Sequence, residues 1–125
     1  MIIRTYAQIL GIVLILVGII GLLVGDGLLL GILNTDVVED IVHILTGGLL
    51  AYVGFGRLDL GAARSVVAAF GVVYLLVGIL GFILPTLFGL IPRGYTVFDN
   101  LLHLVLGVLS LVIVFTRPDT AAAER

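Results

Sequence analysis

Two histidines are the residues of this chain best suited to chemistry, and both stand in the same local pattern. His43 follows Glu39 and Asp40 by four and three residues, and His103 follows an Asp-Asn pair at the same spacing. Helical side chains lean back over the preceding turn, so each imidazole is expected to lie over its acidic or amide neighbours. An imidazole in such a setting can hold a proton, bind a metal ion or ligate a cofactor.

Three interpretations of the histidines remain open. In the first, each histidine bonds its own acidic residue or a nearby carbonyl and ties the helices together. In the second, His43 and His103 bind a cofactor, either one haem between them or a bacteriochlorophyll-type pigment on each. We do not favour it, because the acids one turn away crowd the space of a macrocycle. In the third, the histidines join an outward-facing cation or proton site with a polar cluster that comprises Glu39, Asp40, Asp99 and Asn100.

The sequence assigns neither metal ligands nor catalytic residues. Asp40-x-x-His43 resembles a carboxylate–histidine metal pair, but its counterpart is Asn100-x-x-His103, so the two halves do not match as ligands. No serine, lysine or tyrosine is paired with a base in a recognisable pattern, and the chain has no cysteine. We therefore expect a protein that is not an enzyme.

The composition is that of a membrane protein. Of 125 residues, 62% are hydrophobic and 11% charged, and the mean hydropathy is +1.38. A chain this apolar could not hide its surface in water, whereas a bilayer accepts it if all backbone polar groups are paired inside helices. The net charge of −2 gives no basic patch, so no nucleic-acid partner is expected.

Four segments are long and apolar enough to cross a bilayer, which takes about 20 residues each. They cover approximately residues 5–24, 37–56, 64–84 and 97–116. The sequence therefore predicts an all-α membrane protein, a four-transmembrane-helix bundle that forms a single transmembrane domain over residues 1–125. A helix-capping pattern precedes each histidine: Asp36 with Glu39, and Thr96 with Asp99.

The chain contains an internal repeat. Residues 4–57 align with residues 64–117 without a gap, at an offset of sixty. Each copy is a helix hairpin that crosses the membrane twice, so the bundle is predicted to consist of two parallel-repeat hairpins. In lipid, small residues mark the seams where helices pack closely. The candidate packing glycines are Gly11, Gly18, Gly21 and Gly47, with their counterparts Gly71, Gly78, Gly81 and Gly107.

Arginine placement predicts the orientation. Arg4, Arg57, Arg64, Arg117 and Arg125 fall at the termini and the middle connection, whereas only Arg93 falls in the other loops. The N- and C-termini are therefore expected in the cytoplasm. The two outer loops, residues 25–35 and their counterpart 85–95, are unusually apolar, so we expect them to lie in the membrane interface or dip into it. Two arrangements remain open: the loops roof a pocket above the histidines, or, as we favour, they only fold back over the helix ends.

The second hairpin carries a family resemblance. Leu87-Phe88-Gly89-Leu90-Ile91-Pro92, followed by Asn100-x-x-His103-x-x-x-Gly107, resembles the bacterial four-helix membrane family catalogued as domain of unknown function 4383. The first hairpin departs from the motif, with Asp40 in place of the asparagine. The resemblance implies a multi-pass protein of the bacterial inner (plasma) membrane and supplies no activity. A looser similarity to DoxX-type membrane proteins implies association with electron-transfer complexes, by analogy of fold.

A bundle with almost no aqueous part can act only through its helical surface and interior. We therefore predict an accessory or structural subunit of a larger membrane complex, such as an electron-transfer or photosynthetic one. Its expected partners are the lipid bilayer and other membrane protein subunits. Haem or bacteriochlorophyll bound by His43 and His103 is the runner-up, and a cation or proton site is third.

Overall fold

The computed structural model describes residues 2–116, which form four long helices. They are α1 (Ile2–Val24), α2 (Val37–Phe55), α3 (Leu60–Ile83) and α4 (Val97–Thr116). Each is long and apolar enough to cross a membrane, as predicted. Arg117 and Arg125, which belong to the repeat and to the orientation argument, lie outside the described residues.

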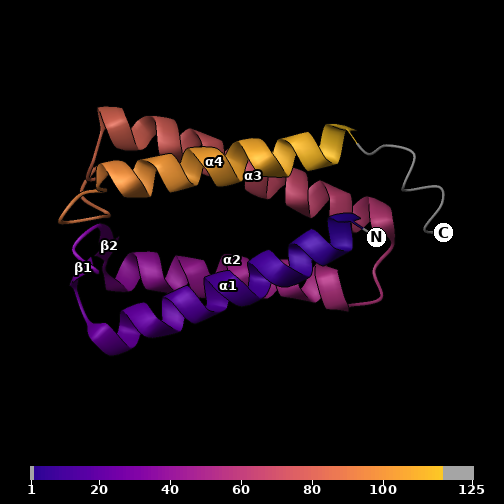
Figure 1. Cartoon of the computed structure of the whole chain (residues 1–125), viewed down its shortest axis with the longest axis horizontal. Helices are drawn as coiled ribbons and strands as arrows, with labels where there is room; N and C mark the ends of the chain where they lie inside the picture. The colour runs from indigo at the N-terminus through magenta and orange to yellow at the C-terminus, as the bar shows by residue number, and fades with distance from the viewer. Residues whose placement is uncertain (1, 117–125) are drawn as a thin grey trace.

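The helices pack as two hairpins. α1 lies along α2 and α3 lies along α4, with far fewer contacts between the hairpins than within them. Both outer loops lie at one end of the bundle, while the start of α1, the end of α4 and the α2–α3 connection lie at the other (Figure 1). We call these the loop end and the terminal end. Arg93 and the polar residues of the histidine segments belong to the loop end. The other arginines of the described residues, Arg4, Arg57 and Arg64, belong to the terminal end.

Side chains fix where the helices begin. Asp36 accepts a hydrogen bond from the Glu39 backbone N–H at 2.9 Å, and the Thr96 hydroxyl accepts one from Asp99 N–H at 3.1 Å. Both caps are where the sequence predicted them. α3 begins earlier than the predicted residue 64, because Asp59 caps it by accepting from the Ala62 N–H at 2.7 Å.

Arginine side chains cover helix ends at the terminal end. Arg4 donates to the carbonyls of Val53, at 3.0 Å, and of Leu58. Arg64, its counterpart in the repeat, donates to the carbonyl of Val114. The last carbonyls of a helix have no partner within it, so these cations complete the C-terminal turns of α2 and α4. The repeated arginines Arg4 and Arg64 thus have a structural role, in addition to the charge distribution from which the orientation is predicted.

Glycines allow the two helices of each hairpin to touch. A Cβ on Gly11 would lie 2.5 Å from the Ala51 backbone nitrogen, and one on Gly107 would lie 2.5 Å from the Leu75 nitrogen. Contacts this short leave no room for a side chain, so the helix backbones are in direct contact. Gly18, Gly47 and Gly78 meet the neighbouring backbone in the same way. Gly71 lies against Ser110 and Leu111, and Gly21 and Gly81 make room for the side chains of Asp40 and Asn100.

The first outer loop contains a short β-hairpin that the sequence did not predict. β1 (Gly27–Leu29) pairs antiparallel with β2 (Leu33–Thr35). The turn between them places Leu30 and Gly31 at φ of 55° and 76°. In so apolar a segment the backbone groups need internal partners, and strand pairing supplies them. The second outer loop, residues 84–96, consists of turns.

An apolar core fills the terminal half of the bundle. Side chains from all four helices are buried in it, among them Ile3, Leu50, Val67 and Val114. Where the hairpins meet there, the Tyr6 hydroxyl of α1 lies 2.6 Å from the Ser110 hydroxyl of α4. The core stops at Leu14 and Tyr74, and from there to the loop end the interior is polar.

Candidate functional site

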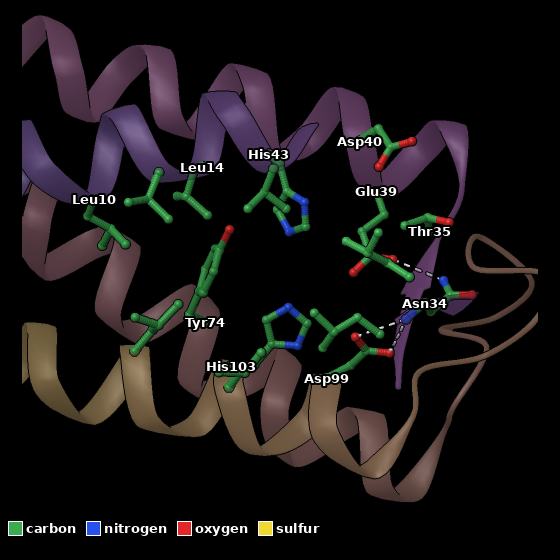
Figure 2. Close-up of a pocket in the computed structure, with 16 residues that line it drawn as sticks. Leu10, Leu14, Asn34, Thr35, Glu39, Asp40, His43, Tyr74, Asp99 and His103 are labelled. Carbon is green, nitrogen blue, oxygen red and sulfur yellow. Dashed lines mark hydrogen bonds between the residues drawn. The ribbon is translucent and has the colours of Figure 1, made fainter. Parts of the chain in front are cut away.

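A cavity lies between the hairpins at the loop end. Its volume is about 250 Å³, and its lining combines leucine and valine side chains of α1 and α4 with a few polar groups (Figure 2). A second cavity of about 200 Å³, between α2, α3 and the second outer loop, reaches the same polar groups. His43, His103, Glu39 and Tyr74 line both cavities. A ligand at these four residues would therefore be surrounded by both hairpins.

The two histidines point toward each other across the gap between the hairpins, one from α2 and one from α4 (Figure 2). Glu39 lies beside them on the side of the loops. Ligand atoms of Glu39, His43 and His103 all lie within 4.8 Å of one another. The packing of the two hairpins against each other thus brings together two histidines that lie sixty residues apart at equivalent positions of the repeat.

One nitrogen of each imidazole is left without a partner. The Nδ1 atoms of His43 and His103 are buried and have no hydrogen-bond partner among the described residues. His103 is only 7% exposed. The first interpretation of the sequence, in which each histidine bonds its own acid or a carbonyl, finds no such bond at these atoms.

Aromatic rings hold His103 in place. Tyr74 and Tyr95 approach its imidazole edge-on, with ring centroids at 5.3 and 4.9 Å. Phe70 stacks on Tyr74 at 3.9 Å and connects this frame to the apolar core. Burial, followed by the negative charge of Glu39, raises the pKa of the Tyr95 hydroxyl, so this group stays protonated.

Asn34 of β2 orients the carboxyl group of Glu39. Its side-chain amide donates to Glu39 Oε2 at 2.9 Å and to Asp36 Oδ2 at 3.0 Å. Its backbone N–H donates to Asp99 Oδ1 and Oδ2 at 3.2 and 3.1 Å. The first outer loop therefore connects both hairpins over the histidines, and it forms a roof to the cavity rather than only covering helix ends.

Asp99 is the counterpart of Glu39 in the repeat, but its carboxyl group accepts hydrogen bonds from backbone N–H groups. One of its oxygens accepts from the Thr96 N–H at 2.7 Å, which closes a reciprocal cap at the start of α4. Glu39 is one methylene longer and reaches Asn34 and the cavity instead. Of the two acids at this position, only Glu39 joins the histidines.

Asp40 also lines the first cavity, but the side chains of Asp40 and Asn100 pack in the seams within the hairpins. A Cβ on Gly21 would fall 1.9 Å from the Asp40 carboxyl oxygen, and one on Gly81 would fall 1.9 Å from Asn100 Oδ1. Each side chain thus packs against a glycine of its own hairpin. The polar cluster expected from the sequence therefore divides: Glu39 belongs with the histidines, whereas Asp40 and Asn100 belong to the helix seams.

Sequence reasoning missed Asn34, Tyr74 and Tyr95. Their counterparts in the repeat are Gly94, Leu14 and Thr35. Because these are residues of other types, a comparison that looks for the same residue in both hairpins does not find them. The signal available was a lone polar or aromatic residue in an apolar segment. Tyr74 in the middle of α3 and Asn34 in a leucine-rich loop both have it.

Comparison with known proteins agrees with the resemblance seen in the second hairpin. Residues 4–116 match the family described as Domain of unknown function (DUF4383). No curated protein and no solved structure matches the chain. The match spans both hairpins and all of the site residues.

Proposed function

The chain belongs to this family, whose description names no activity, and from its geometry we propose that it is an accessory membrane protein that holds a ligand between its two hairpins through His43 and His103. The observation that carries the proposal is that both histidines line a shared interior cavity, while the buried Nδ1 atom of each has no hydrogen-bond partner among the described residues. A buried polar group without a partner costs about 1–3 kcal/mol. Two such histidines at equivalent positions of the repeat are best explained by a ligand that occupies the cavity between them.

A small ligand fits this position better than a macrocycle. Glu39 lies within 4.8 Å of the ligand atoms of both histidines. A haem between the imidazoles would have to occupy the place of that carboxyl group. The cavity of about 250 Å³ is also at or below the lower end of the range for drug-sized ligands, about 300 Å³.

The proposal includes a location of the site in the bacterial cell. The four apolar helices fit a multi-pass protein of the bacterial plasma membrane, with the two hairpins as parallel repeats. With Arg4, Arg57 and Arg64 at the terminal end, the termini face the cytoplasm and the ligand lies near the outer surface. The described residues consist of four helices and short connections, so any further role is exerted through the lipid-facing helix surfaces, on neighbouring membrane proteins.

Native mass spectrometry tests the proposal. The protein is extracted from its source membrane in a mild detergent, beside a double variant with His43→Leu and His103→Leu. We expect the wild type to carry an additional mass that the variant lacks. An optical spectrum of the same samples would reveal a pigment or haem.

Two outcomes would contradict the proposal. One is a wild-type protein of bare polypeptide mass, and the other is an additional mass that persists in the double variant. Stoichiometric copurification of other membrane proteins would support the accessory role, and a protein that always elutes alone would count against it.

A further inference from the structure

We infer that the ligand is a divalent first-row transition-metal ion, bound by Glu39, His43 and His103 at the interface of the two hairpins. The inference rests on the proposed function and names its ligand. It differs from the cation site considered for the sequence, because Asp40, Asp99 and Asn100 take no part. The ion would bridge the hairpins, with two ligands from α2 and one from α4.

The three ligand atoms are close to binding distance. An ion at the centre of a triangle with sides of 4.8 Å lies about 2.8 Å from each corner, and a Zn–N or Zn–O bond is roughly 2.1 Å. Each ligand would thus move inward by about 0.7 Å, which side-chain rotation and a small approach of the hairpins can supply. The contacts between the hairpins are few, so little packing opposes this closure.

The donor set indicates the metal class. Two imidazoles and one carboxylate bind zinc in catalytic sites and non-haem iron in oxygenases, in both cases with coordination positions left open. The chain has no cysteine, so thiolate-selected ions are not expected. The open positions would face the cavity of about 250 Å³, which has room for several water molecules at about 30 Å³ each.

Neighbouring groups already orient the ligands as the outer shell of a metal site does. Asn34 donates to one oxygen of Glu39 and leaves the other for the ion. Tyr74 and Tyr95 both contact the His103 ring edge-on and restrict its rotation. His103 itself is 93% buried, and its Nδ1 has no hydrogen-bond partner among the described residues.

The charge around the site also favours a cation. Four carboxyl groups, those of Asp36, Glu39, Asp40 and Asp99, are each at most 4% exposed at this end of the bundle. Burying negative charge in an apolar surrounding is costly unless positive charge or hydrogen bonds compensate it. Asn34 and backbone N–H groups compensate part of this charge, and a divalent ion beside Glu39 would compensate more.

A metal titration in detergent tests the inference. The full chain, stripped with a chelator, is titrated with Zn²⁺ and Co²⁺. Bound Zn²⁺ is measured by equilibrium dialysis and elemental analysis, and Co²⁺ by its visible d–d absorption. We expect one ion per chain, competition between the two metals, and a cobalt spectrum of four or five nitrogen and oxygen ligands. These readouts need no variant, so they stand even where a substitution prevents folding.

Substitutions assign the ligands. Glu39→Gln and His103→Gln are each expected to weaken Zn²⁺ binding at least tenfold. Asp40→Asn is the matched control, because it installs the residue that already packs against glycine at the equivalent position, Asn100. It removes a nearby charge but no ligand, so it should weaken Zn²⁺ binding much less than Glu39→Gln does. Equal loss in Asp40→Asn and Glu39→Gln would overturn the ligand assignment.

The inference and the proposed function can fail separately. An organic mass that depends on the histidines, together with no Zn²⁺ or Co²⁺ binding at micromolar concentrations, would overturn the metal and leave the ligand site standing. Metal binding of the same strength in the His43→Leu, His103→Leu double variant would overturn the metal site as well as its histidine ligands.

Discussion

Glu39 and Asp99 occupy equivalent places in the two hairpins, and their side chains differ by one methylene group. The shorter Asp99 turns back to the Thr96 N–H and caps its own helix. The longer Glu39 leaves its cap to Asp36 and extends to Asn34 and the histidines. The site is therefore asymmetric although the hairpins are repeats, and the asymmetry supplies one carboxylate where two would repel each other.

Asn34 is the residue on which this arrangement depends most. Replacing it with alanine removes the donor to Glu39 and Asp36, and we expect the free energy of unfolding to fall by about 1–3 kcal/mol. Thermal or denaturant unfolding in detergent measures this change. Leu28→Ala, in the adjacent strand at a half-exposed position, is the control and should change stability little. Equal effects of the two substitutions would show that the amide of Asn34 has no special role.

The helices meet through glycine, and two neighbouring glycines of α2 show how selective this is. A Cβ on Gly47 would lie 2.8 Å from the Gly11 carbonyl oxygen and the Ile15 nitrogen of α1. A Cβ on Gly48 would meet nothing within 4 Å. The first glycine lies in the seam of the hairpin, and the second does not.

Gly47→Ala and Gly48→Ala are therefore expected to have opposite effects. The first forces the backbones of α1 and α2 apart and should cost about 1–3 kcal/mol. The second gains helix propensity and should stabilise the protein by up to about 1 kcal/mol. Melting temperatures in one detergent compare the pair directly. A destabilising Gly48→Ala, or a harmless Gly47→Ala, would place the seam elsewhere.

An element can be predicted from the sequence when the residues that cause it lie close together in the chain. Hydropathy and the Asp36 and Thr96 caps are local, so the four helices and the starts of α2 and α4 were predicted correctly. The β-hairpin was missed because its strands pair through backbone hydrogen bonds alone, and their sequence shows no alternation of apolar and polar residues. Which acid joins the histidines was also beyond the sequence, because it depends on Asn34, which reaches the site only once the loop has folded over the bundle.

The molecule as a whole consists of two tight hairpins with a looser contact between them. Apolar packing joins them at the terminal end, and at the loop end a polar cavity takes the place of a core. The proposed ligand would connect the hairpins where side-chain packing is weakest. Binding and the mutual position of the hairpins are therefore expected to be coupled.

The orientation of the molecule can be tested with introduced cysteines, since the chain has none of its own. Arg57→Cys is expected to react with a membrane-impermeant maleimide only after the cells are opened. Arg93→Cys, in the second outer loop, is expected to react in intact cells whose outer barrier has been made permeable. The opposite labelling pattern would place the ligand site on the cytoplasmic side.

The central claim is that the two histidines serve a ligand and not the stability of the fold. The direct measurement is the free energy of unfolding of the ligand-free protein with His43→Leu and His103→Leu, compared with the wild type. Asp99→Ala, which removes the acceptor of the Thr96 and Asn34 N–H groups and should cost about 1 kcal/mol or more, shows that the assay detects a structural loss. Because the buried Nδ1 atoms have no hydrogen-bond partner among the described residues, we predict that the double variant is as stable as the wild type or more stable, by up to about 3 kcal/mol. A loss of about 2 kcal/mol or more would contradict it and make the histidines structural ties between the helices.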